Sequence, residues 1–270
     1  MEAAPGSTVW IYIKRAGWVP MGKRRIVIVP PAHFGVMGVL LLLLAPFLFG
    51  IVLPAALEAA LGPLGMPNVV PFVLALMALS PFLGFVNVVL RRREVHVRVL
   101  DVGYISLFGI PVPVARPREA TFESLLAINV GGALVPLLIA ALMTAAEALA
   151  PRSLELLSAT AATTVLTLAA TYKFSRVVEG IGIVVPAFLP PAVALLTSVA
   201  LALPLGLLQY IPALSYEGAV YGTLIGADVL NLLSRWDDIT AWLVSIGGAG
   251  TFDGIFVSGV LSMVLSALLV

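Results

Sequence analysis

Two aspartates near the end of the chain are the residues whose chemistry most needs an explanation. Asp228 lies inside the apolar run 224–232, and Asp253 follows a glycine-rich stretch, 247–250. A charged side chain in hydrocarbon costs on the order of 3 kcal/mol, so each must face water or the protein interior. Two carboxyl groups a few ångströms apart share one proton, and such a pair can activate water against a peptide bond. We therefore expect Asp228 and Asp253 to form one catalytic site.

Five further residues are expected to surround a substrate at this site. Asn231, three residues after Asp228, would share its helix face. The glycines let backbone approach a neighbour closely or dip into the membrane. The expected substrate-binding residues are Gly248, Gly250, Thr251, Asn231 and Asn129.

The other acidic residues have ordinary interpretations from their positions. Four of them fall at the ends of predicted spans: Glu58, Glu147, Glu155 and Glu217. Glu123 is predicted to open the third span, where the helix dipole favours an anion. Glu179 is predicted to lie in a loop.

Several other chemistries lack the residues they need. The chain has no cysteine, which excludes thiol nucleophiles and thiolate ligands. It has no HExxH zinc motif and no Walker loop. His33 and His96 lie outside the deep parts of the predicted spans, and Ser258 lacks a Gly-x-Ser-Gly setting, so a serine mechanism has no base and no nucleophile motif. We expect no metal and no cofactor.

Composition places the chain in the membrane class. Of 270 residues, 61% are hydrophobic and 11% are charged, well below the charged fraction of about 25% in soluble domains. Basic residues cluster between apolar blocks, so nucleic acid is not an expected partner, whereas a lipid bilayer is. A span needs about 20 helical residues. Seven runs qualify: 34–54, 69–90, 123–148, 155–172, 186–208, 216–234 and 251–270.

The basic residues also predict an orientation. With the N-terminus in the cytoplasm, Arg152 is the only one of the 15 lysines and arginines that falls outside. The C-terminus is then outside. In this arrangement Asp228 lies about six residues, or roughly 9 Å, from the cytoplasmic end of the sixth span. Asp253 lies near the cytoplasmic start of the seventh, so the two carboxyl groups can meet.

Three segments have strand-like patterns: 8–14, 25–29 and 94–100. They predict a small cytoplasmic sheet, which either caps the first two helices or receives an extended peptide by strand addition. The predicted fold is thus an all-α membrane bundle of about seven transmembrane helices with a small β element. Its parts are a strand-rich segment at 1–32 and a transmembrane domain at 33–270, with a hairpin-like insert at 91–119.

Four strings of residues resemble a prokaryotic membrane family called domain of unknown function 1614. They are 128–136, 180–186, 222–228 and 247–256, and the resemblance covers residues from about 34 to the end. It implies a location in the prokaryotic cell membrane.

More distantly, the arrangement resembles the GxGD intramembrane aspartyl proteases, the presenilin and signal-peptide-peptidase class. In that class two aspartates lie on the sixth and seventh helices and the N-terminus is cytoplasmic. The second aspartate follows Gly-x-Gly directly, whereas Thr251 and Phe252 intervene here. The resemblance implies an intramembrane peptidase that takes single-span membrane proteins or peptides as substrates.

Two other functions fit the same residues. Glycine-interrupted spans carrying Asp228, Asn231, Asp253 and Asn129 could hold a cation or relay protons in a transporter or channel. Alternatively, Gly222, Gly226 and Gly254 could serve only close helix packing in a non-catalytic scaffold. The oligomeric state is not predicted by the sequence.

Overall fold

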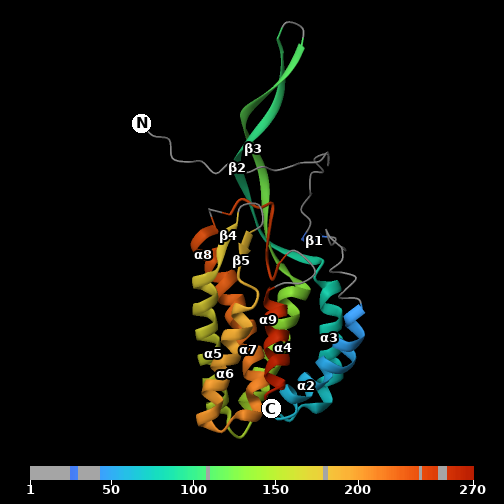
Figure 1. The fold of residues 1–270 in the computed structure, drawn as a ribbon, viewed down its shortest axis with the longest axis vertical. Helices are drawn as coiled ribbons and strands as arrows, with labels where there is room; N and C mark the ends of the chain where they lie inside the picture. Colours follow the sequence, from blue (N-terminus) through green and yellow to red (C-terminus); the bar gives the residue numbers. More distant parts are fainter. Residues whose placement is uncertain (1–24, 30–42, 108–109, 179–181, 237–238, 249–253) are drawn as a thin grey trace.

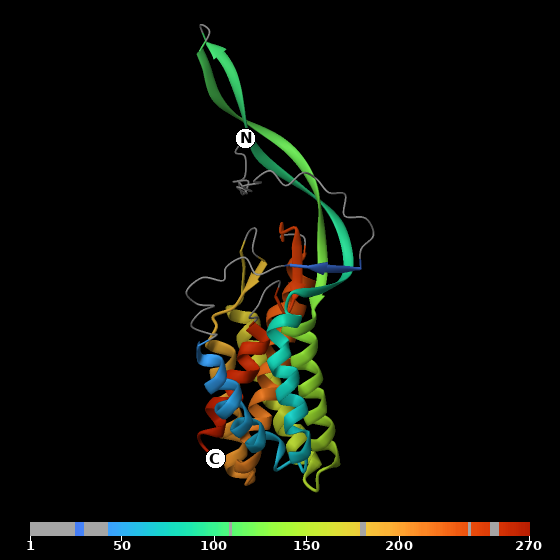
Figure 2. The same ribbon diagram turned by 90° about the vertical axis from the view of Figure 1, so that its right-hand side faces the viewer.

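The chain forms a bundle of apolar helices with a long β-hairpin rising from one end (Figures 1 and 2). The computed structural model describes residues 25–29, 43–107, 110–178, 182–236, 239–248 and 254–270. The C-terminus lies at the end of the bundle opposite the hairpin (Figure 1). Asp253, Gly250 and Thr251, three of the predicted site residues, lie outside the described residues.

Seven helical segments are present in the described ranges, which agrees with the predicted number. The first four are the helix Leu43–Leu61, containing η1 (Leu48–Val52) and α2 (Leu53–Leu61); η2 (Pro67–Val69) with α3 (Val70–Leu83); η3 (Val130–Leu134) with α4 (Val135–Leu149); and α5 (Ser153–Phe174). The last three are α6 (Leu189–Leu205); a long segment made of η4 (Leu208–Tyr210), α7 (Ile211–Thr223), η5 (Leu224–Val229) and α8 (Leu230–Arg235); and α9 (Gly254–Ala267).

Three of these helices are long and apolar enough to cross a membrane, by length and composition. They are Leu43–Leu61, Val130–Leu149 and Ser153–Phe174. Pro67–Leu83, Leu189–Leu205 and Gly254–Ala267 are apolar but shorter. The outer face of the bundle carries large apolar side chains, including Phe72, Leu138, Val165, Leu196 and Leu203.

The hairpin is larger than the predicted insert. Its strands are β2 (Val86–Leu107) and β3 (Ile110–Asn129), paired antiparallel from Asn87 opposite Asn129 to Leu107 opposite Ile110. Two short strands extend the sheet at the bundle end, where β1 (Ile26–Ile28) pairs with β2 and β6 (Leu243–Ile246) runs parallel to β3. The sheet order is therefore β1-β2-β3-β6.

Two predicted span boundaries are wrong because the hairpin strands extend beyond the predicted insert. The second helix ends at Leu83 instead of residue 90, and the third begins at Val130 instead of residue 123. Most of residues 86–90 and all of residues 125–128 are apolar, and most of these side chains are buried or half-buried in the strands. Hydropathy does not distinguish such strands from helix. Glu123 accordingly does not open a helix, and it accepts hydrogen bonds from Arg92 across the hairpin at 3.2 and 3.3 Å.

The α7 helix lies at the centre of the bundle. It packs against α2, α4, α5, α6 and α9, and every α7 residue except Tyr221 is buried. Pro212 sits in its first turn, where a missing N–H costs nothing.

Three glycines spaced four residues apart let α5 pack close to this central helix. A Cβ added to Gly218 would lie 2.3 Å from Thr163 Cγ2, and one added to Gly222 would lie 2.5 Å from Thr167 Cβ. One added to Gly226 would lie 2.2 Å from Thr171 Oγ1. Only glycine fits at these three positions, so the two backbones pack at unusually short range.

Candidate functional site

Asp228 lies in η5, a π-helical stretch that continues α7 toward the hairpin end of the bundle. Its side chain is partly exposed, and its Oδ2 accepts a hydrogen bond from the backbone N–H of Gly247 at 2.9 Å. π-helical turns widen the backbone locally and are frequent at functional sites. The predicted acidic residue therefore sits at an irregular point of the most buried helix.

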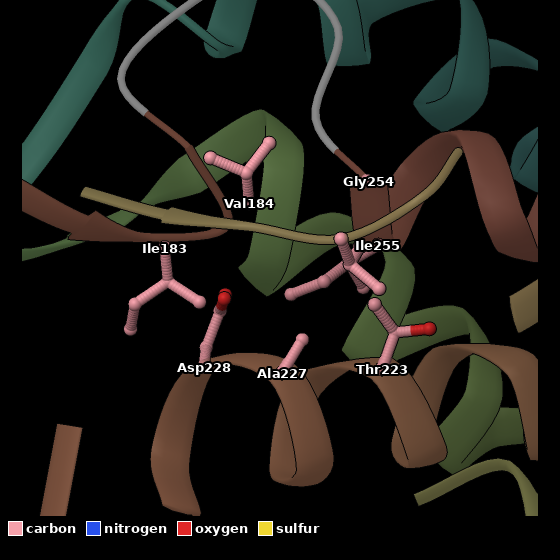
Figure 3. A pocket seen from close by; sticks show the side chains of 8 residues that line it. Ile183, Val184, Thr223, Ala227, Asp228, Gly254 and Ile255 are labelled. Atoms are coloured by element: carbon pink, nitrogen blue, oxygen red, sulfur yellow. The ribbon is translucent and has the colours of Figure 1, made fainter. Parts of the chain in front are cut away.

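A cavity of about 150 Å³ adjoins Asp228. Figure 3 shows Asp228, Ala227 and Thr223 projecting from one helical segment toward the strand that carries Ile183 and Val184. That strand is β5 (Gly182–Val184), which pairs only with β4 (Arg176–Val178) among the described strands. The remaining lining residues are Val185, Gly254 and Ile255.

Two walls of the cavity face each other. One wall carries Asp228, and the opposite wall includes Gly254, the first residue of α9 and the residue that follows Asp253 in the sequence. A volume of this size can hold several water molecules, since a water occupies about 30 Å³ of liquid. The site has both an acid and room for a water nucleophile.

The turn after β6 contacts two π-helical stretches, η3 and η5. Gly247 and Gly248 both have positive φ angles, 81° and 73°. A Cβ on Gly247 would lie 2.5 Å from Ala133 Cβ and 2.7 Å from Ala133 N, so η3 packs directly on this turn. Because Asp228 accepts the Gly247 N–H, the turn connects η3 to η5.

Asn129 belongs to a buried network beside the same turn. Its Oδ1 accepts the Gly132 N–H at 2.7 Å, which caps η3, and its Nδ2 donates to Gly84 O at 2.6 Å and to Asn87 Oδ1 at 3.1 Å. Ser245 Oγ of β6 donates to Asn87 Oδ1 at 2.6 Å. Asn129 therefore reaches the β6 strand through Asn87, and every polar atom of its side chain has a partner.

Asn231 closes the π-helical turn. Its Nδ2 donates to Gly226 O at 3.0 Å, to Ala227 O at 2.9 Å and to Ser175 Oγ at 2.7 Å. Its Oδ1 is buried and has no hydrogen-bond donor among the residues that the structure describes. The side chain satisfies carbonyls that a wider turn leaves open, and it fixes η5 against the end of α5.

Of the predicted set, Asp228 lines the cavity, Gly248 lies in the turn whose Gly247 N–H donates to Asp228, and Asn129 reaches β6 through Asn87. Gly254 was not among the predicted site residues, and it also lines the cavity. Gly248 donates its N–H to Ser245 O at 3.0 Å. In the described part of the chain, no group of three or more His, Cys, Asp or Glu residues could hold a metal ion.

Two acidic residues that the sequence interpretation set aside are buried in the bundle. Glu147 and Glu217 are both fully buried, and their carboxyl groups lie within hydrogen-bonding reach of each other. The predicted span began at residue 216, which placed Glu217 at a helix end, and this placement is wrong. Pro212 is the signal that could have corrected it, because proline favours the first turn of a helix.

The comparisons with known proteins give one match. A family model described as "Protein of unknown function (DUF1614)" matches residues 82–265. This range includes the hairpin, the π-helical stretches η3 and η5, Asp228 and most of α9. No curated protein and no solved structure matches the chain.

Proposed function

The chain belongs to the DUF1614 family, and we propose that it is an intramembrane aspartyl peptidase with Asp228 and Asp253 as its catalytic pair. The observation that supports this most is the cavity of about 150 Å³ beside Asp228, whose opposite wall contains Gly254. Asp228 and Gly254 both line this space, which has room for water, and Gly254 directly follows Asp253 in the sequence.

The proposal includes a membrane arrangement. All seven helical segments are spans in it, and the hairpin end of the bundle faces the cytoplasm of a prokaryotic cell. Lys173, Arg176 and Arg235 lie at the end of α5, in β4 and at the end of α8, which are at the hairpin end, whereas Arg152 lies between α4 and α5 at the other end (Figure 1). This separation of basic residues supports an inside position for the hairpin and an outside position for the C-terminus.

The chemistry follows from a shared proton. The ionised aspartate takes a proton from a cavity water, and the resulting hydroxide attacks the scissile carbonyl carbon. The protonated aspartate donates a hydrogen bond to the carbonyl oxygen. The C–N bond then breaks as the leaving nitrogen takes a proton, and one new carboxyl group and one new amino group are released. In this scheme the Gly247 N–H orients Asp228 through its Oδ2.

The proposed substrates are single-span membrane proteins or peptides in an extended conformation. The β5 strand lines the cavity, and in the described sheet it has one unpaired edge, since β4 occupies the other. An extended peptide that paired with this edge would place its backbone next to Asp228, with main-chain hydrogen bonds supplying affinity. Gly248, Gly250 and Thr251 would approach the peptide from the opposite side, and Asn129 and Asn231 would hold the surrounding backbone.

The test is cleavage of a single-span reporter by purified protein in lipid vesicles. Asp228→Ala and Asp253→Ala should each reduce cleavage to background, while both variants still insert and elute as the parent protein does. Glu58→Gln is the matched control, since Glu58 is an exposed carboxyl group on α2 away from the cavity. Cleavage that persists in either aspartate variant would refute the peptidase proposal.

The same variants decide between the two other functions. Metal-coupled or proton-coupled uptake that needs both aspartates, without cleavage, would favour a transporter or channel. Variants that change only thermal stability would favour a scaffold, for which the close packing of Gly218, Gly222 and Gly226 on α5 is the supporting observation.

A further inference from the structure

A second acidic pair lies in the interior of the bundle, apart from the Asp228 cavity. Glu147 comes from the last turn of α4 and Glu217 from the second turn of α7. Both side chains are 0% exposed. Their carboxyl groups are close enough to share a hydrogen bond.

Hydroxyl groups from three helices surround the pair. Thr160 Oγ1 of α5 donates to Glu147 Oε2 at 2.8 Å and to its Oε1 at 3.1 Å. Thr144 Oγ1 of α4 donates to Glu217 Oε1 at 2.6 Å and lies 2.9 Å from the Tyr221 hydroxyl. Ala140 O, at 3.0 Å, is a second acceptor for Thr144 Oγ1, and either hydroxyl can be the donor in the contact between Thr144 and Tyr221.

No basic side chain balances these two acids in the described part of the chain. The ion pairs seen there, Arg92 with Glu123 and Arg152 with Glu155, involve other acids. The helices packed against α7 bring no further charge to the pair. Neither α6 nor α9 has an ionisable residue. Glu58 of α2 and Lys173 of α5 are exposed. The ionisable side chains that remain near the pair are the phenols of Tyr216 and Tyr221.

Two neighbouring carboxylates without a cation are not stable in a protein interior. Each loses its hydration on burial, and the two negative charges repel each other strongly where the dielectric constant is low. In addition, Glu217 Oε2 is fully buried and has no donor among the described residues, unless one of the two carboxyl groups carries a proton. Thr163 Oγ1, one turn from Thr160 and packed against Gly218, is also buried and unpartnered.

We propose that Glu147 and Glu217 form a proton-binding site in which one proton bridges the two carboxyl groups. The bridging proton removes one negative charge and supplies the missing donor for the pair. It also joins α4 to α7, because each helix contributes one acid. Any movement that separated these helices would break the bridge and expose both acids, so helix packing and proton binding are coupled at this point.

A proton fits the site better than a metal ion does. Calcium takes six to eight oxygen ligands. Here both threonine hydroxyls already donate to the carboxyl oxygens, and a third His, Cys, Asp or Glu ligand is missing from the described residues around the pair. A proton shared between the two carboxyl groups needs no ligand other than those two groups.

Infrared spectroscopy of the purified protein in vesicles tests this proposal. A protonated carboxylic acid has a C=O band separate from that of a carboxylate. Protein made with carboxyl-¹³C-labelled glutamate should show a protonated-acid band at neutral pH that shifts with the label. The label separates this band from any band of an aspartate pair, so the result is independent of the peptidase proposal and needs no cleavage assay.

Variants then assign the band. Glu147→Gln and Glu217→Gln keep the side-chain size, and the new amide N–H can donate to the remaining carboxylate in place of the proton. Each should remove the glutamate band, whereas Glu58→Gln should leave it unchanged. Absence of a label-sensitive band in the parent protein would overturn the proposal. Loss of the band on adding sodium or calcium would also overturn it, by showing that a metal ion occupies the site.

Discussion

The long helix through the centre of the bundle carries acids in two very different surroundings. Asp228 and Glu217 are 11 residues apart on this helix (228 − 217), which corresponds to about 16 Å along its axis. Asp228 is partly exposed, borders a cavity and accepts a backbone N–H. Glu217 is fully buried, borders a second acid and accepts a hydroxyl.

The surroundings of a carboxyl group decide what it can do. A substrate and water can reach an acid that lines a cavity, so Asp228 can take part in chemistry. They cannot reach Glu217, which instead must be neutralised where it lies, and its acid partner on α4 makes it a structural proton site. The first acid should therefore matter for turnover and the second for the association of α4 with α7.

The largest expected loss of stability comes from removing the buried acid. Glu217→Ala leaves a cavity and removes the hydrogen bond from Thr144 to Glu217, so it should lower the free energy of unfolding by about 2–4 kcal/mol. Denaturant unfolding in detergent measures this loss. Glu58→Ala is the control, since the Glu58 side chain is exposed. Equal stability of the two variants would contradict a structural role for buried Glu217.

The next effect concerns the turn that donates to Asp228. Gly247→Ala forces a positive φ on alanine and places its Cβ 2.5 Å from Ala133 Cβ, which should cost about 2–3 kcal/mol and reduce reporter cleavage. Gly65→Ala has a similar φ, 77°, with nothing within 4 Å of the added Cβ. It should cost only about 1 kcal/mol and leave cleavage intact. Equal cleavage by both variants would show that this turn does not matter for Asp228.

A similar cost should follow from filling the helix contact beside Glu217. Gly218→Ala puts a Cβ 2.3 Å from Thr163 Cγ2, which predicts a loss of about 1–3 kcal/mol. Thr163→Ala removes that methyl group, so the double variant should recover part of the loss. Additive losses in a double-mutant cycle of unfolding free energies would mean that the two residues do not contact each other.

The smallest effect belongs to the hairpin. Arg92 and Glu123 form a partly exposed ion pair, so Arg92→Ala should change the free energy of unfolding by less than about 1 kcal/mol. The thermal midpoint, measured at low and high salt, checks this. A loss as large as that of Glu217→Ala would mean that the hairpin contributes to the stability of the bundle far more than its contacts indicate.

Much of the helical architecture could be predicted from the sequence. Apolar runs gave the number of helices, because burying a helix in lipid or protein needs long runs of apolar residues. The hairpin length was underestimated, since most of residues 86–90 and all of residues 125–128 are apolar, like the helices that they adjoin. Strand pairing between these two distant segments depends on tertiary contacts that local hydropathy does not contain.

The site was predicted less completely than the helices. Asp228 could be recognised as a charged residue in an apolar run, and the glycines after β6 as an interruption before the last predicted helical span. The Glu147–Glu217 contact could not be read from spacing, because it joins α4 to α7 across 70 residues (217 − 147). The role of Asn231 was also hidden, since it depends on a π-helical turn whose open carbonyls appear only in three dimensions.

The claim that Asp228 and Asp253 form one site can be measured by thiol cross-linking, because the chain contains no cysteine. The double variant Asp228→Cys, Asp253→Cys is treated with a short bifunctional thiol reagent in vesicles, and the cross-linked peptides are identified by mass spectrometry. We expect an efficient cross-link within one chain, and none when Glu58→Cys replaces the change at Asp228. Failure of the two engineered thiols to cross-link, although each reacts singly, would contradict the shared site.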